Sequence, residues 1–312
     1  MRIGFVCTNY NNSAYTKTAI ASLHAGSGWS DVRVVVVDNG SQQDDVGSLN
    51  DITREFPTVE LVRNADNVGY FPGLNLGIRH LRTRFPDTDL LVVGNNDLVF
   101  PGTFVETVQR HRDVFDTWAV VAPDLVTPDG VHQNPHVLHP ISRIRKLIWD
   151  LYFLSYGAAL LIRLAARMTR PFTVREENAP DGALYQTPGP IEQGYGACYL
   201  LGPVFFKHFT RLWAPTFLMQ EEFFLYEQLK EIDQLTYYDP RFVVFHHGHA
   251  TMHGVPSRRQ WKISQEAHHV YKRYLAMSPA ERCSLIAAGS REPGHGETGR
   301  GKRRWRRPNR TA

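Results

Sequence analysis

Short apolar runs alternate with amphipathic stretches along the first third of the chain. The apolar runs cover residues 3–7, 32–37, 59–62 and 90–93, and the second is rich in valine. Such runs are typical of strands buried on both faces of a parallel sheet. The first amphipathic stretch ends near residue 24, and the next three cover residues 46–56, 74–84 and 103–115. This alternation predicts an α/β fold, with a mostly parallel, Rossmann-like central sheet and flanking helices.

Polar residues follow each of these apolar runs. The first run ends in Thr8-Asn9, the second in DNGS at 38–41, the third leads to residues 64–67, and the fourth to GNND at 94–97. Asn, Asp and Gly also suit turns and helix caps, so chain geometry alone could explain any single segment. Four such segments in succession lie at the sheet edge where α/β sheets bind ligands. Together they favour a polar ligand crevice.

Composition places the chain among ordinary globular proteins. It has 312 residues, 42% hydrophobic and 21% charged, which excludes a collagen-like, coiled-coil or wholly disordered chain. Cys7, Cys198 and Cys283 are far apart and match no metal-site spacing, which is compatible with a reducing compartment. The amino terminus enters a strand directly, and no uncharged stretch reaches the roughly 18–20 residues of a spanning helix. We therefore expect a cytoplasmic protein, and leave open peripheral attachment to the inner face of the cell membrane.

Three segments of the first half resemble a known enzyme family. They are VVVVDNGS at residues 34–41, NADNVGYFPGLNLGI at 64–78 and LLVVGNND at 90–97. In this order they are similar to the amino-terminal half of family 2 glycosyltransferases of the A-type fold, and most similar to the rhamnosyltransferase-like branch. The resemblance covers about residues 1–125 and resumes around 191–255. It implies an inverting glycosyltransferase that moves a sugar from a nucleotide-diphosphate donor to a glycan or lipid-linked acceptor, in surface polysaccharide or glycolipid synthesis.

The resemblance also assigns donor contacts at the strand ends. Asp38 would accept hydrogen bonds from the nucleobase or ribose, and two glycines would let the backbone approach the donor closely. Asn67 and Asn75 would offer amides to the nucleotide or to the loop's own backbone. Phe71-Pro72 departs from the small residues that the family prefers there. The residues implied at the donor are Thr8, Asn9, Asp38, Asn39, Asn67, Gly69, Gly73, Asn75 and Asn96.

A single carboxylate follows the fourth apolar run, where the family carries its metal motif. Breaking a sugar–phosphate bond requires stabilisation of the diphosphate, which a hard divalent cation supplies. The resemblance implies that Asp97 binds Mg²⁺ or Mn²⁺, and that His246 completes the metal site or contacts the diphosphate. Alternatively, Asp97 is only a helix cap before Pro101. The histidines at 246, 247, 249 and 253 lack nearby cysteines and fit no common structural zinc spacing, which argues against zinc.

Two adjacent glutamates open an apolar, helix-like segment in the second half. Placed there, Glu221 and Glu222 could simply favour the helix dipole. The family carries Glu-Asp at this point, and an inverting transfer needs a carboxylate that takes the proton of the acceptor hydroxyl. The resemblance therefore implies that Glu222, in the Asp position, is the general base. Glu221 would position the acceptor or the loop.

An insertion, about residues 131–190, separates the two regions of resemblance. Residues 143–170 are helix-like, rich in aromatic side chains and framed by arginines. This segment could pack on the body as an amphipathic helix, or lie on an anionic membrane near a lipid-linked acceptor. We expect a single glycosyltransferase domain over residues 1–278, with a nucleotide-sugar-binding half at 1–125 and an acceptor and catalytic half at 191–278.

The carboxyl-terminal segment carries the basic excess of the chain. Residues 289–312 contain eight Arg or Lys and two Glu, a net charge of +6, whereas the whole chain has +4. After Pro279 the sequence loses its periodicity, so residues 279–312 are predicted to be a disordered basic tail. The tail could bind anionic lipid headgroups. Nucleic acid is the less favoured partner, because no nucleic-acid-binding module precedes the tail.

Two other functions fit parts of this pattern. A nucleotidyltransferase on a related sheet would need a basic residue at the phosphates near the first loop, and Lys17 lies too far into the helix. A noncatalytic protein that binds sugar nucleotides or nucleic acid would tolerate the loss of both Asp97 and Glu222. Diphosphate release from a sugar nucleotide separates these alternatives from a glycosyltransferase.

Overall fold

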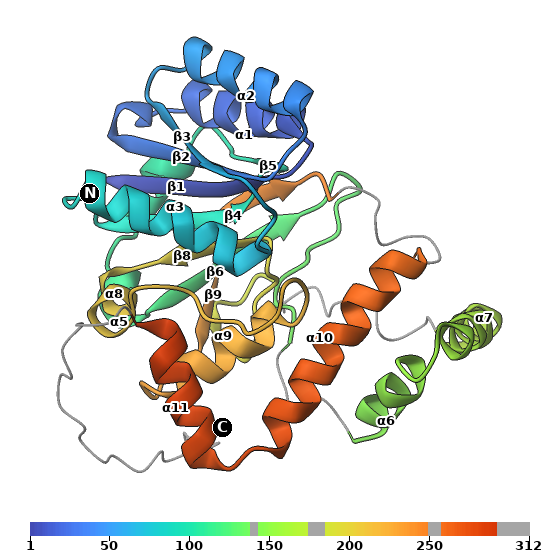
Figure 1. Cartoon of the computed structure of the whole chain (residues 1–312). Helices are drawn as coiled ribbons and strands as arrows, with labels where there is room; N and C mark the ends of the chain where they lie inside the picture. Colours follow the sequence, from blue (N-terminus) through green and yellow to red (C-terminus); the bar gives the residue numbers. More distant parts are fainter. Residues whose placement is uncertain (138–142, 174–184, 249–256, 292–312) are drawn as a thin grey trace.

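A central sheet with helices on both faces makes up the body of the protein in the computed structural model (Figure 1). The structure describes residues 1–137, 143–173, 185–248 and 257–291. Its strands are β1 (Ile3–Asn9), β2 (Val32–Asn39), β3 (Val59–Asn64), β4 (Leu90–Asn95), β5 (Leu98–Val99), β6 (Val120–Val126), β7 (Gly189–Ile191), β8 (Cys198–Leu201) and β9 (Thr236–His246). Its helices are α1 (Ser13–Ala25), α2 (Gln43–Glu55), α3 (Tyr70–Arg84), α4 (Phe104–Arg110), α5 (Val114–Thr117), α6 (Arg143–Tyr152), α7 (Tyr156–Thr173), α8 (Pro203–His208), α9 (Glu221–Lys230), α10 (Arg258–Ala276) and α11 (Pro279–Ser290), with a 3-10 turn at Trp29–Asp31.

The strands follow the order β3-β2-β1-β4-β8-β6-β9-β5 across the sheet, and β7 pairs with β9. β1 is parallel to β2 and β4, β2 to β3, and β6 to β9. β8 runs antiparallel to both neighbours, and β5 and β7 run antiparallel to β9. The predicted α/β fold is therefore confirmed, but the sheet is mixed. β8 follows β7 directly, with no helix in residues 192–197 between them, so the strand–helix alternation that makes the first four strands parallel does not apply to it.

The strands alternate their side chains between two apolar layers. On one face Phe5 and Val36 pack with residues of α1, α2 and α4 such as Ile20; on the other, Val35 packs with residues of α3, α8 and α9 such as Leu74. Figure 1 shows α1 and α2 on the opposite side of β1 from α3. Because both faces of the first strands are buried, their polar side chains collect at the strand ends.

A third apolar cluster joins α9 to α10 and α11. It is small and aromatic, and it lies apart from the two layers on the sheet. Through it, the helix that begins with the paired glutamates is held against the last helices of the described chain. Its buried members are Trp213, Phe224, Tyr274 and Ile286.

Helix α11 corrects the predicted start of the basic tail. Ser278 and Glu281 form a capping box, with Pro279 in the first turn. At the other end, the Ser290 carbonyl accepts hydrogen bonds from the N–H groups of Thr210 (3.0 Å) and Arg211 (3.3 Å). The prediction of disorder from residue 279 is therefore wrong for residues 279–290, because the cap and these contacts stabilise a helix there. The rest of the predicted tail, residues 292–312, lies outside the described residues.

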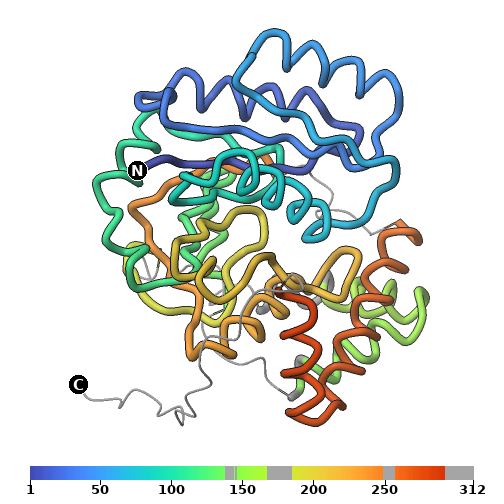
Figure 2. Tube along the Cα trace, turned by 60° about the vertical axis from the view of Figure 1, so that its left-hand side comes forward, coloured from blue at the N-terminus to red at the C-terminus, as the bar shows by residue number. Residues whose placement is uncertain are grey.

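Two helices predicted as continuous are each divided by a turn. Residues 103–115 form α4 and α5, and residues 143–170 fall in α6 and α7. Between α6 and α7, the Ser155 hydroxyl accepts a hydrogen bond from the Ala158 N–H (3.1 Å) and caps α7. In the described ranges, every helix is too short or too polar to cross a membrane. Figures 1 and 2 show the α6–α7 pair at the periphery of the molecule, beside α10.

Candidate active site

The polar strand ends predicted from the sequence meet at one edge of the sheet. Thr8 is the register partner of Asn95, and Asn9 is the partner of Asp38. Asn9 and Asp38 are almost fully buried, whereas Thr8 is half-buried. Asp38 accepts a hydrogen bond from the Ser41 N–H at 3.0 Å. The structure therefore brings together the ends of β1, β2 and β4, as the strand pattern requires.

Asn9 is the hub of a hydrogen-bond network within the protein. Its amide nitrogen donates to Ser41 Oγ (3.1 Å) and Asp45 Oδ2 (2.6 Å). Its oxygen accepts from Thr16 Oγ1 (2.8 Å) and from the amide of Asn96 (3.1 Å). Both the nitrogen and the oxygen of the Asn9 side-chain amide are thus hydrogen-bonded inside the protein. Asn9 and Asn96 shape the edge, and their predicted contact with the donor stays a prediction.

Asn39 holds the loop at residues 67–69 against the end of β2. Its amide nitrogen donates to Asn67 Oδ1 (3.1 Å) and to the Gly69 carbonyl (2.9 Å), and its oxygen accepts from the Val68 N–H (3.1 Å). Asn67 Oδ1 also accepts from the Gly69 N–H (3.0 Å). The loop expected to cradle the donor is therefore built by side-chain amides.

Two glycines allow close contacts within the chain itself. Gly69 has φ +97°, and a Cβ there would overlap the Phe217 carbonyl, which accepts the N–H of Tyr70 at 3.0 Å. A Cβ on Gly73 would lie 2.9 Å from Thr8 Cγ2. Glycine at these positions lets the 67–69 loop and α3 pack against their neighbours. Close approach to the donor is compatible with this packing but is not what the glycines are seen to do.

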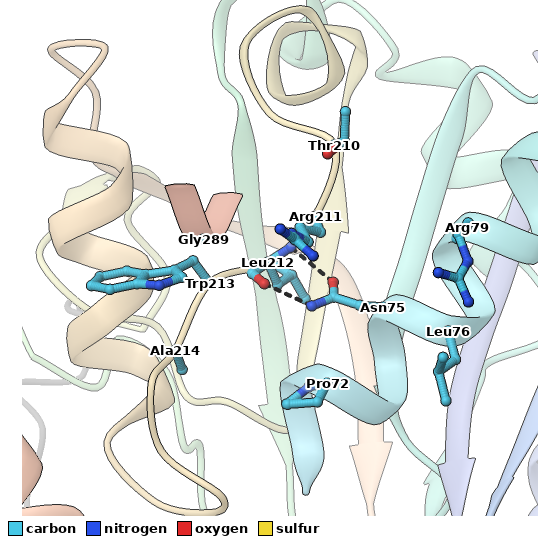
Figure 3. A pocket seen from close by; sticks show the side chains of 10 residues that line it. All are labelled: Pro72, Asn75, Leu76, Arg79, Thr210, Arg211, Leu212, Trp213, Ala214 and Gly289. Carbon is cyan, nitrogen blue, oxygen red and sulfur yellow. Dashed lines mark hydrogen bonds between the residues drawn. The ribbon is translucent and has the colours of Figure 1, made fainter. Parts of the chain in front are cut away.

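Asn75 does not lie at the strand-end edge. Its amide nitrogen donates to the Leu212 carbonyl (2.8 Å), and its oxygen accepts from the Leu212 N–H (2.9 Å), as Figure 3 shows. It lines a separate cavity of about 260 Å³ between α3 and residues 210–214, together with Arg79 and Arg211. The amide therefore bonds to the backbone of a segment far away in the sequence and not to the loop's own backbone, and its predicted contact with the nucleotide stays a prediction. Asn75 joins the two halves of the protein.

Asp97 and His246 come together where β5 pairs with β9. His246 Nε2 lies 3.3 Å from Asp97 Oδ1, and both side chains are almost fully buried. His246 Nδ1 lies 2.7 Å from Gln133 Oε1. A ring that donates its Nδ1–H to Gln133 presents the lone pair of Nε2 toward the Asp97 carboxylate. The Asn95 side-chain nitrogen also lies 3.5 Å from Nε2. A proton or a cation between Nε2 and Asp97 would be shared by a ring nitrogen and a carboxylate oxygen.

Glu221 and Glu222 occupy the first turn of α9 in different surroundings. Glu221 is only 5% exposed, and its Oε1 has no hydrogen-bond partner among the described residues. Burial, and then the neighbouring Glu222, raise the pKa of Glu221 to about 8. Glu222 Oε1 instead accepts a hydrogen bond from the Gly196 N–H at 3.1 Å. At neutral pH Glu221 therefore retains its proton, while Glu222 has a donor aimed at its carboxyl oxygen.

Two tyrosines that the sequence analysis did not single out link the two acidic groups. The Tyr70 hydroxyl donates to the Gly196 carbonyl (2.9 Å). Burial raises the pKa of Tyr70 and of Tyr195, and the charges of Glu222 and Asp97 add to the effect in both. Gly196 bonds to both Tyr70 and Glu222, and the ring of the preceding Tyr195 lies 5.9 Å from that of His246, so these groups lie close together. Tyr70 occupies the aromatic position of the motif at residues 64–78, and this position could have indicated Tyr70 as a site residue.

A strained turn precedes the glutamate pair. Met219 (φ +73°) and Gln220 (φ +70°) are consecutive non-glycine residues in the left-handed region. That region is unfavourable for residues with a side chain, and such strain persists where surrounding structure imposes it. The Gln220 carbonyl accepts the Phe224 N–H (3.2 Å), so the turn leads directly into α9. It sets the direction in which both carboxyl groups project.

A family model described as "Glycosyl transferase family 2" matches residues 5–167, just over half of the chain. The chain belongs to glycosyl transferase family 2. The match covers the motifs at residues 34–41, 64–78 and 90–97 and ends before the glutamate pair. No curated protein matches this family 2 chain.

Solved glycosyltransferases resemble the chain in fold at low identity. The mannosyltransferase PcManGT from Pyrobaculum calidifontis, in complex with GDP-Man and Mn²⁺, has 13% identity and a TM-score of 0.51 over 92% of this chain and 69% of its own. TarS 1-349 from S. aureus, in complex with UDP-GlcNAc, has 15% identity and a TM-score of 0.36 over 42% of this chain and 36% of its own. The chain thus spans about a third of that TarS structure. The first likeness shows that this family 2 glycosyltransferase has the A-type fold over both halves.

Asp97 and His246 fit a divalent cation as a partial ligand set. In the part of the chain that the structure describes, no three His, Cys, Asp or Glu side chains gather into a complete metal site. Asp97 supplies a carboxylate oxygen, and His246 supplies a ring nitrogen 3.3 Å away. Hard cations that bind nucleotides take a few protein ligands and complete their shell with phosphate oxygens and water. The donor set in this family 2 glycosyltransferase suits such a cation.

Proposed function

We propose that the chain is an inverting, divalent-cation-dependent glycosyltransferase that transfers a sugar from a nucleotide-diphosphate donor to a glycan or lipid-linked acceptor. The observation that carries the proposal is the convergence of two acidic groups on one segment. The Tyr195 ring lies beside His246, the neighbour of Asp97, with ring centroids 5.9 Å apart, and the adjacent Gly196 donates its N–H to Glu222 at 3.1 Å. Asp97 would hold a cation at the leaving diphosphate, and Glu222 would take the proton of the attacking hydroxyl. Membership of family 2 supports the class of reaction.

Asp97 and His246 form the leaving-group side of the proposed site. A bound Mg²⁺ or Mn²⁺ would supply Lewis-acid stabilisation to the charge that develops on the diphosphate. Asp97 would hold the cation through its carboxylate and His246 through Nε2, because Nδ1 is engaged with Gln133. Burial of both side chains strengthens their electrostatic interactions. Thr8, Asp38 and the loop at residues 67–69 remain the proposed contacts to the nucleotide.

Glu222 forms the attacking side. As the acceptor oxygen bonds to the anomeric carbon, Glu222 takes the hydroxyl proton. The bond from the anomeric carbon to the diphosphate breaks on the opposite face, and its electron pair leaves with the diphosphate, so the configuration inverts. Glu221, kept neutral by burial, adds no second negative charge beside the base. It positions the acceptor or the turn before α9.

The exposed face of the α6–α7 pair supports attachment to an anionic membrane surface. Eight large apolar side chains between residues 144 and 164 are 38–74% exposed. Residues 143–170 carry six Arg or Lys and one Asp. Apolar residues framed by cations suit the interface of an anionic bilayer. We therefore propose a peripheral protein at the inner face of the cell membrane, in surface polysaccharide or glycolipid synthesis, and retain the rhamnosyltransferase-like branch on the order of its motifs.

Donor turnover tests this function. The protein is incubated with a panel of sugar nucleotides and Mn²⁺, and release of the nucleoside diphosphate is followed with an acceptor extract. We expect one donor to turn over, and Asp97→Ala to lower the rate by about 100-fold or more because the leaving group loses its cation site. The control is Asp44→Ala, which removes an exposed carboxylate from the first turn of α2. Unchanged turnover in Asp97→Ala would contradict the proposal.

A further inference from the structure

The cavity of about 260 Å³ that Asn75 lines lies between α3, residues 210–214 and the end of α11 (Figure 3). Its volume is near the lower end of the range for small-molecule pockets, about 300–1,000 Å³. Asp97, His246 and Glu222 do not line it. The cavity is therefore separate from the proposed cation and base, and neither the family motifs nor the proposed reaction gives it a role.

The charged side chains in the lining of this cavity are two arginines, Arg79 and Arg211, and the described lining contains no carboxylate. Arg79 is exposed and makes no ion pair among the described residues. It lies four residues after Asn75 on the same face of α3. Figure 3 shows the two guanidinium groups on either side of the Asn75 side chain. Two like charges beside one cavity repel each other, and an anion bound between them would remove that repulsion.

Backbone carbonyls hold the Arg211 side chain in place. One terminal nitrogen of its guanidinium donates to the carbonyls of Ala288 (3.2 Å) and Arg291 (3.1 Å). The other terminal nitrogen makes no hydrogen bond within the described residues. Neutral carbonyls orient the guanidinium without cancelling its charge, so Arg211 presents an oriented cation with hydrogen-bonding capacity left for a ligand.

The backbone that carries Arg211 is fixed from two sides. Asn75 forms hydrogen bonds to the N–H and the carbonyl of Leu212. From α9, the Gln228 side chain accepts the Trp213 N–H (2.9 Å) and donates its amide to the Arg211 carbonyl (2.9 Å). A ligand would therefore meet a wall that is already ordered, which lowers the entropic cost of binding.

We propose that this cavity binds a phosphate monoester, with the phosphate group at Arg79 and Arg211. A monoester carries a charge of about −1.5 to −2 at pH 7, and guanidinium groups match the geometry of phosphate oxygens. The cavity is larger than a bare oxyanion requires. The organic part of the ester contacts the apolar residues of the lining, Pro72, Leu76 and Ala214. This inference goes beyond the proposed function and does not depend on it.

Isothermal titration calorimetry with phenyl phosphate, inorganic phosphate and phenol tests the inference. The full-length protein is used at fixed ionic strength and without divalent cations. We expect phenyl phosphate to bind more tightly than inorganic phosphate or phenol. Arg79→Gln should weaken its binding about tenfold through loss of a charge-assisted contact. Arg110→Gln is the matched control, because it removes an exposed arginine at the end of α4 that does not line the cavity.

Two further variants test the second arginine and the place of binding. Arg211→Gln should weaken binding at least as much as Arg79→Gln, and thermal unfolding verifies that it folds without its bonds to the two carbonyls. If it does not fold, Arg79→Glu replaces it, since reversal of an exposed charge should abolish binding. Asp97→Ala should bind phenyl phosphate as the wild type does, because Asp97 does not line the cavity.

Four results would overturn the inference. They are no detectable binding of phenyl phosphate by the wild type, equal weakening by Arg79→Gln and Arg110→Gln, equal affinity for phenyl phosphate and inorganic phosphate, and loss of binding in Asp97→Ala with Arg79→Gln unaffected. The last result would place the ester at the proposed donor site. Because the titration uses neither a sugar nucleotide nor a metal, failure of the proposed function leaves its outcome valid.

Discussion

Two groups of polar side chains differ in how their hydrogen-bonding atoms are used. One is the set of amides at the ends of β1 and β2, the proposed donor edge, and the other is the set of acidic groups and His246 around Asp97 and the start of α9, the carboxylate edge. At the donor edge, the amides of Asn9 and Asn39 form hydrogen bonds to other parts of the same chain. At the carboxylate edge, Glu221 Oε1 has no hydrogen-bond partner among the described residues, and His246 turns Nε2 toward Asp97. Both edges look alike in sequence, as short polar segments next to apolar runs. The difference lies between amides whose atoms are bonded within the chain and a buried carboxyl oxygen, Glu221 Oε1, that is left without a donor among the described residues.

This contrast separates two kinds of substitution. Removing an amide of the donor edge breaks internal hydrogen bonds, so the free energy of unfolding should fall while the chemistry of the folded molecules changes little. Removing the Glu221 carboxyl group should cost the fold less, because its Oε1 has no hydrogen-bond partner among the described residues. At the carboxylate edge, the rate of transfer should carry the effect.

The largest expected effect separates the two adjacent glutamates. Glu222→Gln should lower the rate of transfer by about 10²–10⁴-fold, because the amide cannot take a proton. Glu221→Gln should stay within about threefold of the wild type at pH 7, since it replaces a carboxyl group that burial keeps neutral. Steady-state kinetics with saturating donor measure both. The reverse order of effects would make Glu221 the base.

Loss of the two hydrogen bonds between Asn75 and Leu212 should lower the stability of the folded protein. Asn75→Ala leaves the Leu212 N–H and carbonyl without their partner, so the free energy of unfolding should fall by about 1–3 kcal/mol. Urea denaturation measures the loss. Asn64→Ala is the control, because that amide makes a local bond to the Asp66 carbonyl. A tenfold rise in donor KM at unchanged stability would instead place Asn75 at the donor.

Two truncations locate the end of the folded body. Ending the chain after Arg291 should leave stability and turnover on a soluble acceptor unchanged. Ending it after Ala288 deletes Ser290, whose carbonyl accepts two hydrogen bonds from Thr210 and Arg211, and should cost about 1–3 kcal/mol. Thermal unfolding of the two proteins side by side gives the comparison. Equal melting temperatures would show that α11 does not need its last turn.

The smallest expected effect is a pH dependence of stability. Since the pKa of Glu221 is raised to about 8 in the folded protein, the folded state holds a proton that the unfolded state releases near pH 4.5. The contribution of Glu221 to stability is therefore present below pH 4.5 and is lost as pH rises toward 8. The melting temperature of wild type minus that of Glu221→Gln should fall as the pH is raised from 5 to 9. A difference that is flat with pH would contradict the assigned protonation.

Much of the fold could be predicted because it depends on local patterns. The valine-rich runs give the first four strands, and the polar residues after them do reach one edge. The direction of β8 was not evident, because β8 follows β7 with no helix between them. The α11 helix was not evident, because it depends on a capping box within a sequence of weak periodicity. Other features depend on contacts between residues that are far apart in the sequence. Nothing near Asn75 in the sequence indicates that its amide binds Leu212.

The candidate site was predictable by residue type but not by state. Asp97 and His246 were paired from the resemblance, and they lie 3.3 Å apart. The protonation of Glu221 depends on how deeply α9 is buried, which its own sequence does not reveal. Tyr195 was not identified because its role depends on two carboxyl groups from different strands and helices.

The left-handed turn at Met219 and Gln220 has a consequence for how the protein can change. Glycine at either position would relieve backbone strain and, by that measure alone, favour the folded state. It would also free the segment that aims the glutamate pair. Under the proposed function, Met219→Gly and Gln220→Gly should therefore raise stability and slow transfer, so these two positions couple the stability of the chain to its activity.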